Sequence, residues 1–196
     1  MSDLLVATNN AGKLAEFRRL LASLTARVVA PADLGLQLEP DEPHDTYAAN
    51  AAAKAVAFCR ASGLVTLADD SGIEVAALGW GPGVRSARWA GEPGRNAERL
   101  LAALGDAADR RARMVCWLAV ATPASGEPRV QLFYGVVDGE VAREARGSGG
   151  FGYDPVFLLP SGSTTAELPE GEKDRLSHRG RAVAAALPRL QELLAA

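Results

Sequence analysis

The sequence lacks several features that would place it in a special class of protein. Only two of its 196 residues are cysteines, Cys59 and Cys116, and both lie among apolar neighbours. Two distant cysteines make no disulfide framework, so we expect buried thiols in a reducing compartment. No apolar run approaches the roughly 18 residues of a membrane span, and the N-terminus lacks the basic start of a signal peptide. These absences predict a cytoplasmic protein with no membrane partner.

The chain also lacks an excess of positive charge. It carries 21 basic and 24 acidic residues, which gives a formal net charge of −3. An acidic balance without a basic stripe argues against nucleic acid as a partner. Any polyanion that the protein binds must therefore be small and held locally. Hydrophobic residues make up 48% of the chain, enough to build the core of one large domain or two small lobes.

Two adjacent carboxylates follow a short apolar run in the first half of the chain. Residues 64–68 predict a buried strand that stops before Asp69 and Asp70, and residues 73–78 predict another. Adjacent residues of a strand point to opposite faces, so both carboxylates can meet one ligand only if the chain bends, which Gly72 permits. Such a pair suits Mg²⁺. The alternative is an Asx turn in which Asp70 bonds its own backbone.

A polar turn lies between an apolar strand at 4–7 and an amphipathic helix at 14–24. Its residues are Thr8, Asn9, Asn10, Ala11, Gly12 and Lys13. A strand, a polar turn and a helix in this order direct free backbone N–H groups and the positive helix end at an anion. A phosphate site is therefore one interpretation of this turn, and an asparagine-rich N-cap with a solvated Lys13 is the other.

An alanine-rich helix is predicted from Thr46 to about residue 62, where Gly63 stops it. Asn50 and Lys54 are four residues apart and so share one face, which looks either into a cleft or into water. Glu42 precedes this helix, and capping electrostatics alone would explain a carboxylate there.

Three strands are predicted at 114–122, 129–137 and 140–143, with a hairpin turn at Asp138-Gly139. Strands joined in this way would form a second lobe over roughly residues 112–145. A ligand is then expected in the cleft between the two lobes.

Glycines at 147, 149, 150 and 152 surround two aromatic residues and a carboxylate. Glycine lets backbone approach a ligand closely, Phe151 and Tyr153 offer flat faces, and Asp154 can accept from ring N–H groups. This combination suits a planar heterocycle. The alternative is a loop pinned by two core aromatics. Further on, Ser177 predicts the N-cap of a last helix at 182–194, with the basic His178 and Arg179 at the end that attracts anions.

Taken together, these stretches resemble the non-canonical purine NTP pyrophosphatases, the family of inosine triphosphate pyrophosphatase-like enzymes. The resemblance covers nearly the whole chain. It rests on six motifs in order: Thr8-x-Asn10-x-x-Lys13; Thr46-Tyr47 with Asn50-Ala51 and Lys54-Ala55; Ala68-Asp69-Asp70-Ser71-Gly72; Pro82-Gly83 with Ser86-Ala87-Arg88; Gly150-Phe151-Gly152-Tyr153-Asp154-Pro155; and Glu172-Lys173 with Ser177-His178-Arg179.

The resemblance implies an α/β fold, a single domain over residues 1–196 that is elongated and two-lobed. A mixed sheet with flanking helices and an active site between the lobes is expected, in a homodimer. It also implies hydrolysis of ITP, dITP and XTP to the monophosphate and pyrophosphate with Mg²⁺ as cofactor. The alternatives are a pyrophosphatase for other modified nucleotides and a nucleotide-binding sensor without hydrolysis.

The same resemblance implies roles for individual residues. Asp70 would be the general base and a Mg²⁺ ligand, with Glu42 as the second metal ligand. The substrate would be bound by Thr8, Asn9, Asn10, Ala11, Gly12 and Lys13 at the phosphates, by Ser71, by Phe151, Gly152, Tyr153 and Asp154 at the purine, and by Lys173, His178 and Arg179 at the base edge and nearby phosphate. The chain departs from the family pattern at Ala49, Trp80 and Asp174, and Ala49 thins the acidic complement expected around the metal.

Overall fold

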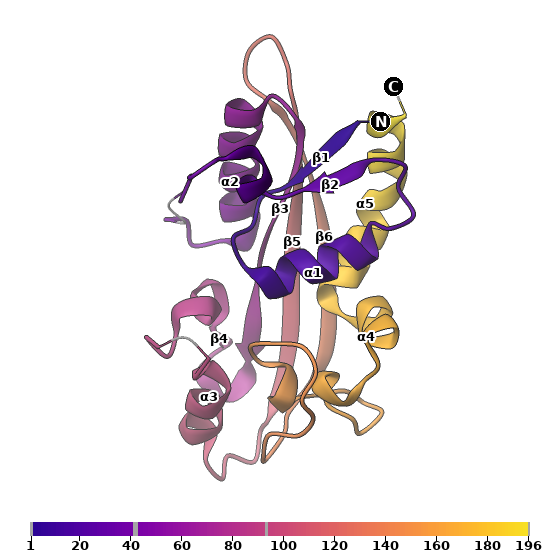
Figure 1. Ribbon diagram of the computed structural model, residues 1–196. Helices are drawn as coiled ribbons and strands as arrows, with labels where there is room; N and C mark the ends of the chain where they lie inside the picture. The colour runs from indigo at the N-terminus through magenta and orange to yellow at the C-terminus, as the bar shows by residue number, and fades with distance from the viewer. Residues whose placement is uncertain (1, 41–42, 93, 196) are drawn as a thin grey trace. The chain divides into compact units, whose positions relative to one another are not determined.

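The computed structural model describes residues 2–40, 43–92 and 94–195 (Figure 1). Its strands are β1 (Asp3–Val6), β2 (Arg27–Val29), β3 (Val65–Val75), β4 (Gly81–Pro82), β5 (Arg111–Thr122), β6 (Arg129–Val141) and β7 (Phe157–Leu158). Its α-helices are α1 (Ala11–Leu20), α2 (Tyr47–Ser62), α3 (Asn96–Leu104), α4 (Glu170–Leu176) and α5 (His178–Leu194). The predicted α/β class is confirmed.

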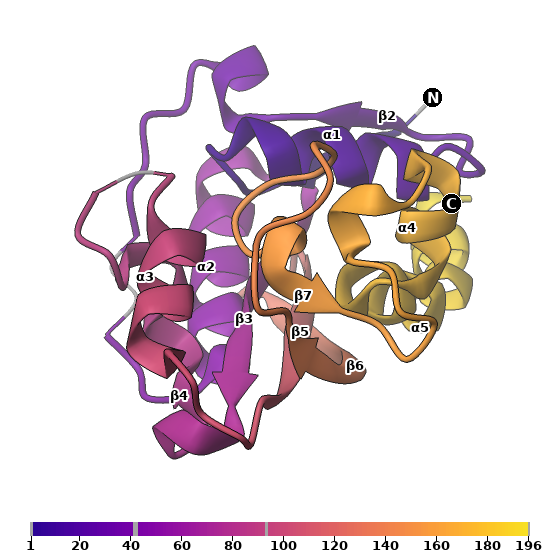
Figure 2. The same ribbon diagram turned by 90° about the horizontal axis from the view of Figure 1, so that it is seen from below.

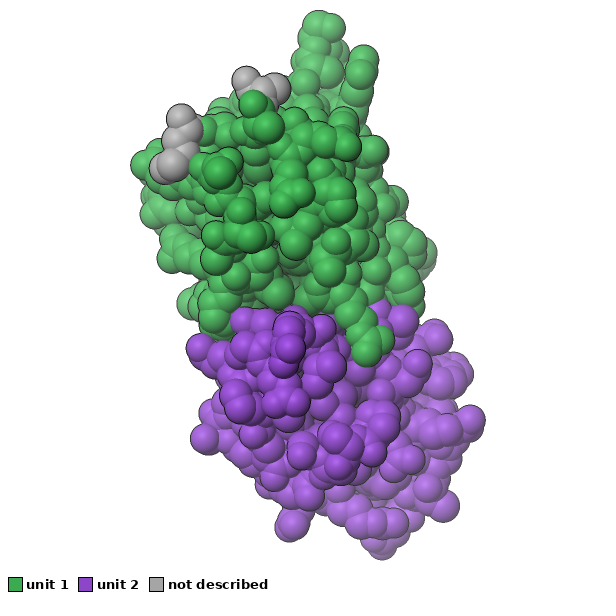
Figure 3. All heavy atoms as spheres, turned by 90° about the vertical axis from the view of Figure 1, so that its right-hand side faces the viewer, with its two compact units in different colours: residues 1–70, 116–135, 179–196 green, residues 71–115, 136–178 purple. Residues whose placement is uncertain are grey.

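The chain divides into two compact units, which Figure 3 colours separately. Unit 1 comprises residues 1–70, 116–135 and 179–196, and unit 2 comprises residues 71–115 and 136–178. Strands β3, β5 and β6 each contribute residues to both units. The lobe predicted at 112–145 is a different division of the chain, because it includes residues 116–135 of unit 1.

The sheet is mixed, with the strand order β2-β1-β3-β5-β6-β7 and with β4 beside β3. Strand β1 pairs in parallel with both β2 and β3. Strands β4 and β7 pair antiparallel with β3 and β6 respectively. The parallel pairs require crossover connections, and helices α1 and α2 lie in the chain between these strands.

The strand predicted to stop at Ala68 does not stop there. Strand β3 runs without interruption from Val65 to Val75, through both carboxylates and Gly72. The predicted bend at Gly72 and the Asx turn are therefore wrong. The extended backbone continues, and side-chain alternation continues with it.

The predicted hairpin turn at Asp138-Gly139 is also wrong. Strand β6 passes straight through these residues to Val141. A Cβ atom at Gly139 would lie 2.4 Å from the backbone oxygen of Leu158 in β7. The glycine therefore permits close packing against the neighbouring strand, a use that a turn-forming dipeptide does not reveal by itself.

Alternate residues of β1 and β3 supply two separate cores in unit 1. Leu4, Val6 and Leu67 belong to one cluster, with apolar residues of α1 and α5. Leu5 and Ala68 belong to the other, with Ala51, Ala55 and Phe58 of α2. Helices α2 and α5 accordingly lie on opposite sides of the sheet (Figure 2). This period of two decides which face each carboxylate of β3 occupies.

The helix boundaries largely follow the sequence signals. Thr46 caps α2 by accepting from the Ala49 N–H, and Gly63 ends it with a left-handed φ of 67°. Helix α1 begins at Ala11 and ends at Leu20, earlier at both ends than predicted, because Asn10 is its N-cap. Among the residues described, no helix is long and apolar enough to cross a membrane.

Both cysteines are free and buried, as predicted. Burial raises the pKa of the Cys59 thiol and raises that of Cys116 to about 12. Neither thiol is therefore activated as a nucleophile.

Candidate functional site

The two carboxylates of β3 have different environments because they point to opposite faces of the sheet. Asp69 lies on the same face of β3 as Leu67, the face toward α1 and α5. Asp70 lies on the same face as Ala68, the face toward α2. Both are buried, with exposed fractions of 2% and 6%. The two carboxylates therefore do not form the predicted common cation site, and each has its own set of partners.

Asp69 is the acceptor for two basic side chains. The Lys13 ammonium donates to its Oδ1 at 3.1 Å and lies 3.0 Å from its Oδ2. The Arg179 guanidinium reaches the same Oδ2, with its Nη2 at 3.2 Å. Lys13 is therefore not a solvated lysine at a helix start. Its charge is held beside the polar turn by a buried carboxylate.

Glu16 is a functional candidate that sequence reasoning missed. It is 4% exposed, and its Oε2 accepts from Arg179 Nη1 at 2.5 Å. Arg179 thus lies between two carboxylates, Glu16 and Asp69. Its Cζ atom also lies over the Phe17 ring, 5.7 Å from the ring centroid. The available signal was spacing, because Glu16 follows Lys13 by three residues and shares its face of α1.

The charges of this group determine the protonation state of Asp69. Burial alone would raise the pKa of this carboxyl, but Lys13, Arg179 and Lys54 together hold it well below its ordinary value. Burial likewise opposes the charged form of Arg179, yet Asp69 and Glu16 raise its pKa further. The basic side chains around Asp69 therefore favour its anionic form.

Asp70 is held from the α2 side. The Asn50 side-chain amide donates to Asp70 Oδ2 at 3.1 Å, and the same amide exchanges hydrogen bonds with the backbone of His44. The Lys54 ammonium donates to the backbone oxygen of Asp69 at 3.0 Å. Asn50 and Lys54 therefore face strand β3, so the alternative in which they look only into water is wrong.

The polar turn before α1 has the geometry of an N-cap. Asn10 Oδ1 accepts from the Lys13 backbone N–H at 3.0 Å, and Thr8 Oγ1 accepts from the Asn10 N–H at 3.2 Å. Asn9, Asn10 and Ala11 are exposed, whereas Thr8 and Gly12 are partly buried. The first turn of a ten-residue helix thus lies open to solvent beside the Lys13 ammonium, an arrangement that suits an anion.

The glycine-rich segment of unit 2 gathers Phe151, Asp154 and Lys173. Asp154 Oδ2 accepts from the Phe151 N–H and from Lys173 Nζ, both at 2.7 Å. The Lys173 ammonium lies 5.3 Å from the centroid of the Phe151 ring. Asp154 and Lys173 are 4% and 6% exposed. A flat ring and a donor-only cation thus lie side by side.

Tyr153 and Phe151 have different positions. Tyr153 is 7% exposed in the core cluster of unit 2, and its hydroxyl donates to the Ser86 backbone oxygen at 2.8 Å. Burial raises the pKa of that hydroxyl. Phe151 is only partly buried. Tyr153 therefore pins the loop as a core aromatic does, and only Phe151 keeps an accessible face.

The remaining predicted residues lie as follows. Gly152 has a left-handed φ of 65° and open space around its Cα. Ser71 is partly buried in β3, and His178 is buried at the start of α5. Glu42 lies outside the described residues.

The donor set fits a magnesium ion that is held mainly by its substrate. Mg²⁺ commonly binds one or two carboxylates together with substrate phosphates and waters. Asp70 would supply one hard oxygen ligand, whereas Asp69 is already engaged by two cations. Within residues 2–40, 43–92 and 94–195, no group of three or more His, Cys, Asp or Glu side chains could hold a metal by itself.

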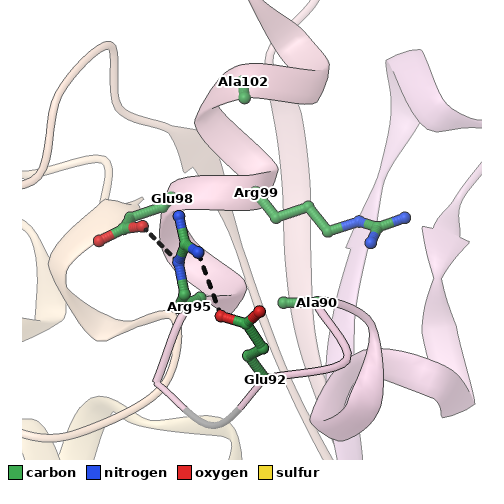
Figure 4. Close-up of a pocket in the computed structure, with 6 residues that line it drawn as sticks. All are labelled: Ala90, Glu92, Arg95, Glu98, Arg99 and Ala102. Atoms are coloured by element: carbon green, nitrogen blue, oxygen red, sulfur yellow. Dashed lines mark hydrogen bonds and ion pairs between the residues drawn. The ribbon is translucent and has the colours of Figure 1, made fainter.

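A surface pocket of about 320 Å³ in unit 2 contains none of the predicted site residues (Figure 4). Arg95 lies between Glu92 and Glu98 there, with an N–O distance of 3.1 Å to each. Arg99 also lines the pocket, and its Cζ atom lies over the Trp89 ring, 5.0 Å from the ring centroid. Arg95 is thus paired with both glutamates of the pocket, whereas Arg99 contacts the Trp89 ring.

Comparison with known proteins adds a family. The model of the Ham1 family matches residues 4–189. The dITP/XTP pyrophosphatase of Nitrosomonas europaea is 48% identical over 196 residues, which cover 98% of this chain and 96% of that protein. The dITP/XTP pyrophosphatase of Chromobacterium violaceum is 48% identical over 97% of this chain and 98% of its own.

Solved structures agree in fold. The chain is similar to a HAM1 protein from Coxiella burnetii, with a TM-score of 0.86, 37% identity, and coverage of 98% of this chain and 100% of that one. It is also similar to a nucleoside-triphosphatase, or dITP/XTP pyrophosphatase, from Mycobacterium abscessus, with a TM-score of 0.72 and 41% identity over 96% and 99% of the two chains.

Proposed function

Because the chain belongs to the Ham1 family, we propose that it hydrolyses non-canonical purine nucleoside triphosphates such as dITP and XTP to the monophosphate and pyrophosphate. The observation that carries the proposal is the nearly full-length match to dITP/XTP pyrophosphatases at 48% identity. The buried Asp70 carboxylate, which the Asn50 amide orients, supports hydrolysis, because a protein that only bound nucleotide would need no group to activate water.

In the proposed mechanism the polar turn and Lys13 bind the phosphates. Backbone N–H groups of the first turn of α1 and the Lys13 ammonium stabilise charge that develops during the reaction. Asp70 orients or deprotonates a water that attacks between the α- and β-phosphates. The Asn50 amide fixes the direction of the Asp70 carboxylate through its 3.1 Å hydrogen bond.

Asp70 would also hold Mg²⁺, with Glu42 as the expected second carboxylate. When bound, the ion would neutralise charge on the leaving pyrophosphate. Asp69 is not available for this task, because Lys13 and Arg179 occupy its oxygens. Its proposed task is to hold those two cations.

Base selection is proposed to fall on the six-position of the purine. Hypoxanthine and xanthine present a carbonyl oxygen there and adenine an amine. A group that only donates, such as Lys173, favours the oxygen and leaves the amine mismatched. Phe151 would stack on the base, and Gly152, Tyr153 and Asp154 would shape the slot. We also propose that Ser71, His178 and Arg179 contact the substrate.

The test is release of pyrophosphate from ITP, dITP, XTP, GTP, ATP and dTTP with and without Mg²⁺. We expect fast release from the first three and a requirement for the metal. Equal rates over the whole panel would contradict the proposal, and release from none would favour the nucleotide sensor. Release of pyrophosphate only from other modified nucleotides would favour a pyrophosphatase for those nucleotides. We also propose that the protein is a cytoplasmic homodimer that binds no nucleic acid. Light scattering checks the dimer, and a binding assay with DNA and RNA checks the absence of nucleic-acid binding.

A further inference from the structure

Asp154 accepts hydrogen bonds from its own protein at both carboxylate oxygens. Its Oδ2 accepts from the Phe151 backbone N–H and from Lys173 Nζ, each at 2.7 Å. Its Oδ1 accepts from the Thr165 hydroxyl at 2.9 Å. Both oxygens are thus occupied, and the residue is 4% exposed. This carboxylate therefore has a different use from the direct acceptance of a ring N–H.

Thr165 is the neutral partner in this arrangement. It lies in the short 3₁₀ segment Thr165–Glu167 and is 4% exposed. Its hydroxyl also lies 3.2 Å from the Asp154 backbone oxygen, but the carboxylate oxygen is nearer. A bond to an ionised acceptor is about twice as strong as one to a neutral acceptor, so the hydroxyl proton belongs with Oδ1.

Gly150 shows how closely the loop is built over this pair. A Cβ atom there would lie 2.1 Å from Asp154 Oδ2 and 2.7 Å from Lys173 Nζ. The backbone also has a left-handed φ of 70°. The backbone of Gly150 therefore lies directly against both the carboxylate and the ammonium, which are joined to each other by a hydrogen bond of 2.7 Å.

We propose that Thr165 is a positioning residue for base selection. Its hydroxyl fixes Asp154, and Asp154 fixes the Lys173 ammonium beside the Phe151 ring. Neither Thr165 nor Asp154 touches the base. This inference rests on the proposed function, since it concerns how the same slot separates a six-oxo purine from a six-amino purine.

The physical reason is the precision that such selection requires. A flexible lysine can reach an oxygen from many directions, but a cation disfavours an amine strongly only where the two are forced to meet. Thr165, Asp154 and Lys173 are joined by successive hydrogen bonds. Removing one of these bonds therefore reduces discrimination between the six-oxo and the six-amino base more than it reduces binding of the six-oxo base.

The test compares Thr165→Val, which keeps the shape and removes the hydroxyl, with Thr165→Ser, which keeps the hydroxyl. The readout is the ratio of kcat/KM for dITP to that for dATP. For Thr165→Val we expect the ratio to fall about three- to tenfold, mainly through a lower KM for dATP. Thr165→Ser should stay within about twofold of the wild type. Asp154→Asn should lower the ratio further, because it removes the charge opposite Lys173.

A second readout makes the inference independent of catalysis. Calorimetry of IMP and AMP binding to the same three variants measures base preference without hydrolysis or metal. We expect the preference for IMP to fall in Thr165→Val and Asp154→Asn and to persist in Thr165→Ser. Melting temperatures show which variants are folded.

The outcomes separate the two claims. If the wild type releases no pyrophosphate but prefers IMP, the proposed function fails. The calorimetry of IMP and AMP binding then still tests whether Thr165 positions Lys173. The inference is overturned if Thr165→Val matches Thr165→Ser, if Thr165→Val slows both nucleotides equally, or if the wild type shows no preference for IMP.

Discussion

Two buried carboxylates, Asp69 in unit 1 and Asp154 in unit 2, each hold a lysine in different surroundings. Asp69 is shared by Lys13 and Arg179, and Arg179 binds Glu16 in turn. Asp154 binds one cation, Lys173, and two neutral donors. The first is a network of charges, which suits a polyanion nearby. The second is a single pair in neutral surroundings, which suits an uncharged base edge.

The two carboxylates also reach their positions by different means. Asp69 lies on a strand, where alternation alone assigns it to the face of α1 and α5. Asp154 lies in the short 3₁₀ segment Asp154–Val156, and its position depends on the close approach of Gly150. A strand tolerates local changes because its neighbours hold it, whereas the loop depends on glycines that leave no room for a side chain, Gly150 among them. Each prediction below tests one side of this comparison.

The largest expected effect belongs to Asp70, the neighbour of Asp69 on the opposite face. Asp70→Asn should lower kcat by about 10²- to 10⁴-fold, because the amide cannot take a proton from water. KM for the nucleotide should change little, since the variant keeps the shape of the side chain. Steady-state kinetics with dITP measure both values, and Asp138→Asn on the exposed part of β6 is the control. A kcat near that of the wild type would remove Asp70 from the mechanism.

Removal of the charge at Asp69 should destabilise the protein rather than only slow it. Asp69→Asn leaves the buried Arg179 and the partly buried Lys13 without their shared anion, at a cost of about 3–5 kcal/mol in the free energy of unfolding. Urea denaturation at pH 7 measures this loss. A change below about 1 kcal/mol would mean that the network contributes little.

The pH dependence of stability provides a second measurement on the same variant. The folded pKa of Asp69 lies below its unfolded value of about 3.9. Its stabilisation is therefore fully present above about pH 4 and is lost as the pH falls further toward the folded pKa. Between pH 5 and pH 3 the wild type should lose more stability than Asp69→Asn. Parallel curves would contradict the assignment.

On the side of unit 2, Gly150→Ala should displace the pair of Asp154 and Lys173. The new Cβ would lie 2.1 Å from Asp154 Oδ2, and the backbone φ of 70° adds strain. We expect a loss of about 1–3 kcal/mol in stability and a reduced preference for dITP over dATP. Gly162→Ala is the matched control, because its φ is 89° but nothing lies within 4 Å of the added atom. Equal behaviour of the two variants would show that strain alone explains the effect.

The smallest expected effect belongs to the exposed turn before α1. Thr8→Val removes the acceptor for the Asn10 N–H, a hydrogen bond of 3.2 Å in an exposed position. The loss in stability should stay below about 1 kcal/mol, and KM for dITP should rise by only a few-fold. Thr8→Ser should restore the wild-type values. A large fall in melting temperature would mean that the turn supports unit 1 more than the N-cap geometry indicates.

The sequence predicted the helices better than the strand ends. Helix α2 begins after Thr46 and ends before Gly63 as predicted, because capping residues act within a few residues of chain. The predicted strand end at Ala68 and turn at Asp138-Gly139 were wrong, because polar residues and glycine inside a strand can serve contacts with distant segments. Glu16 and Thr165 were missed for the same reason, since their partners are 163 and 11 residues away.

By itself the sequence determined the α/β class, the capped helices, the buried thiols and the stretches where polar residues gather. These follow from local rules of periodicity and capping, and the order of the motifs indicated the family. Only the tertiary structure decided that β3 continues through Asp69 and Asp70 without a bend, that Lys13 is an ion-pair partner, and that Asp154 supports Lys173. The physical reason is that charges and hydrogen bonds depend on distance in space, and only the folded chain brings those side chains within 3–4 Å of one another.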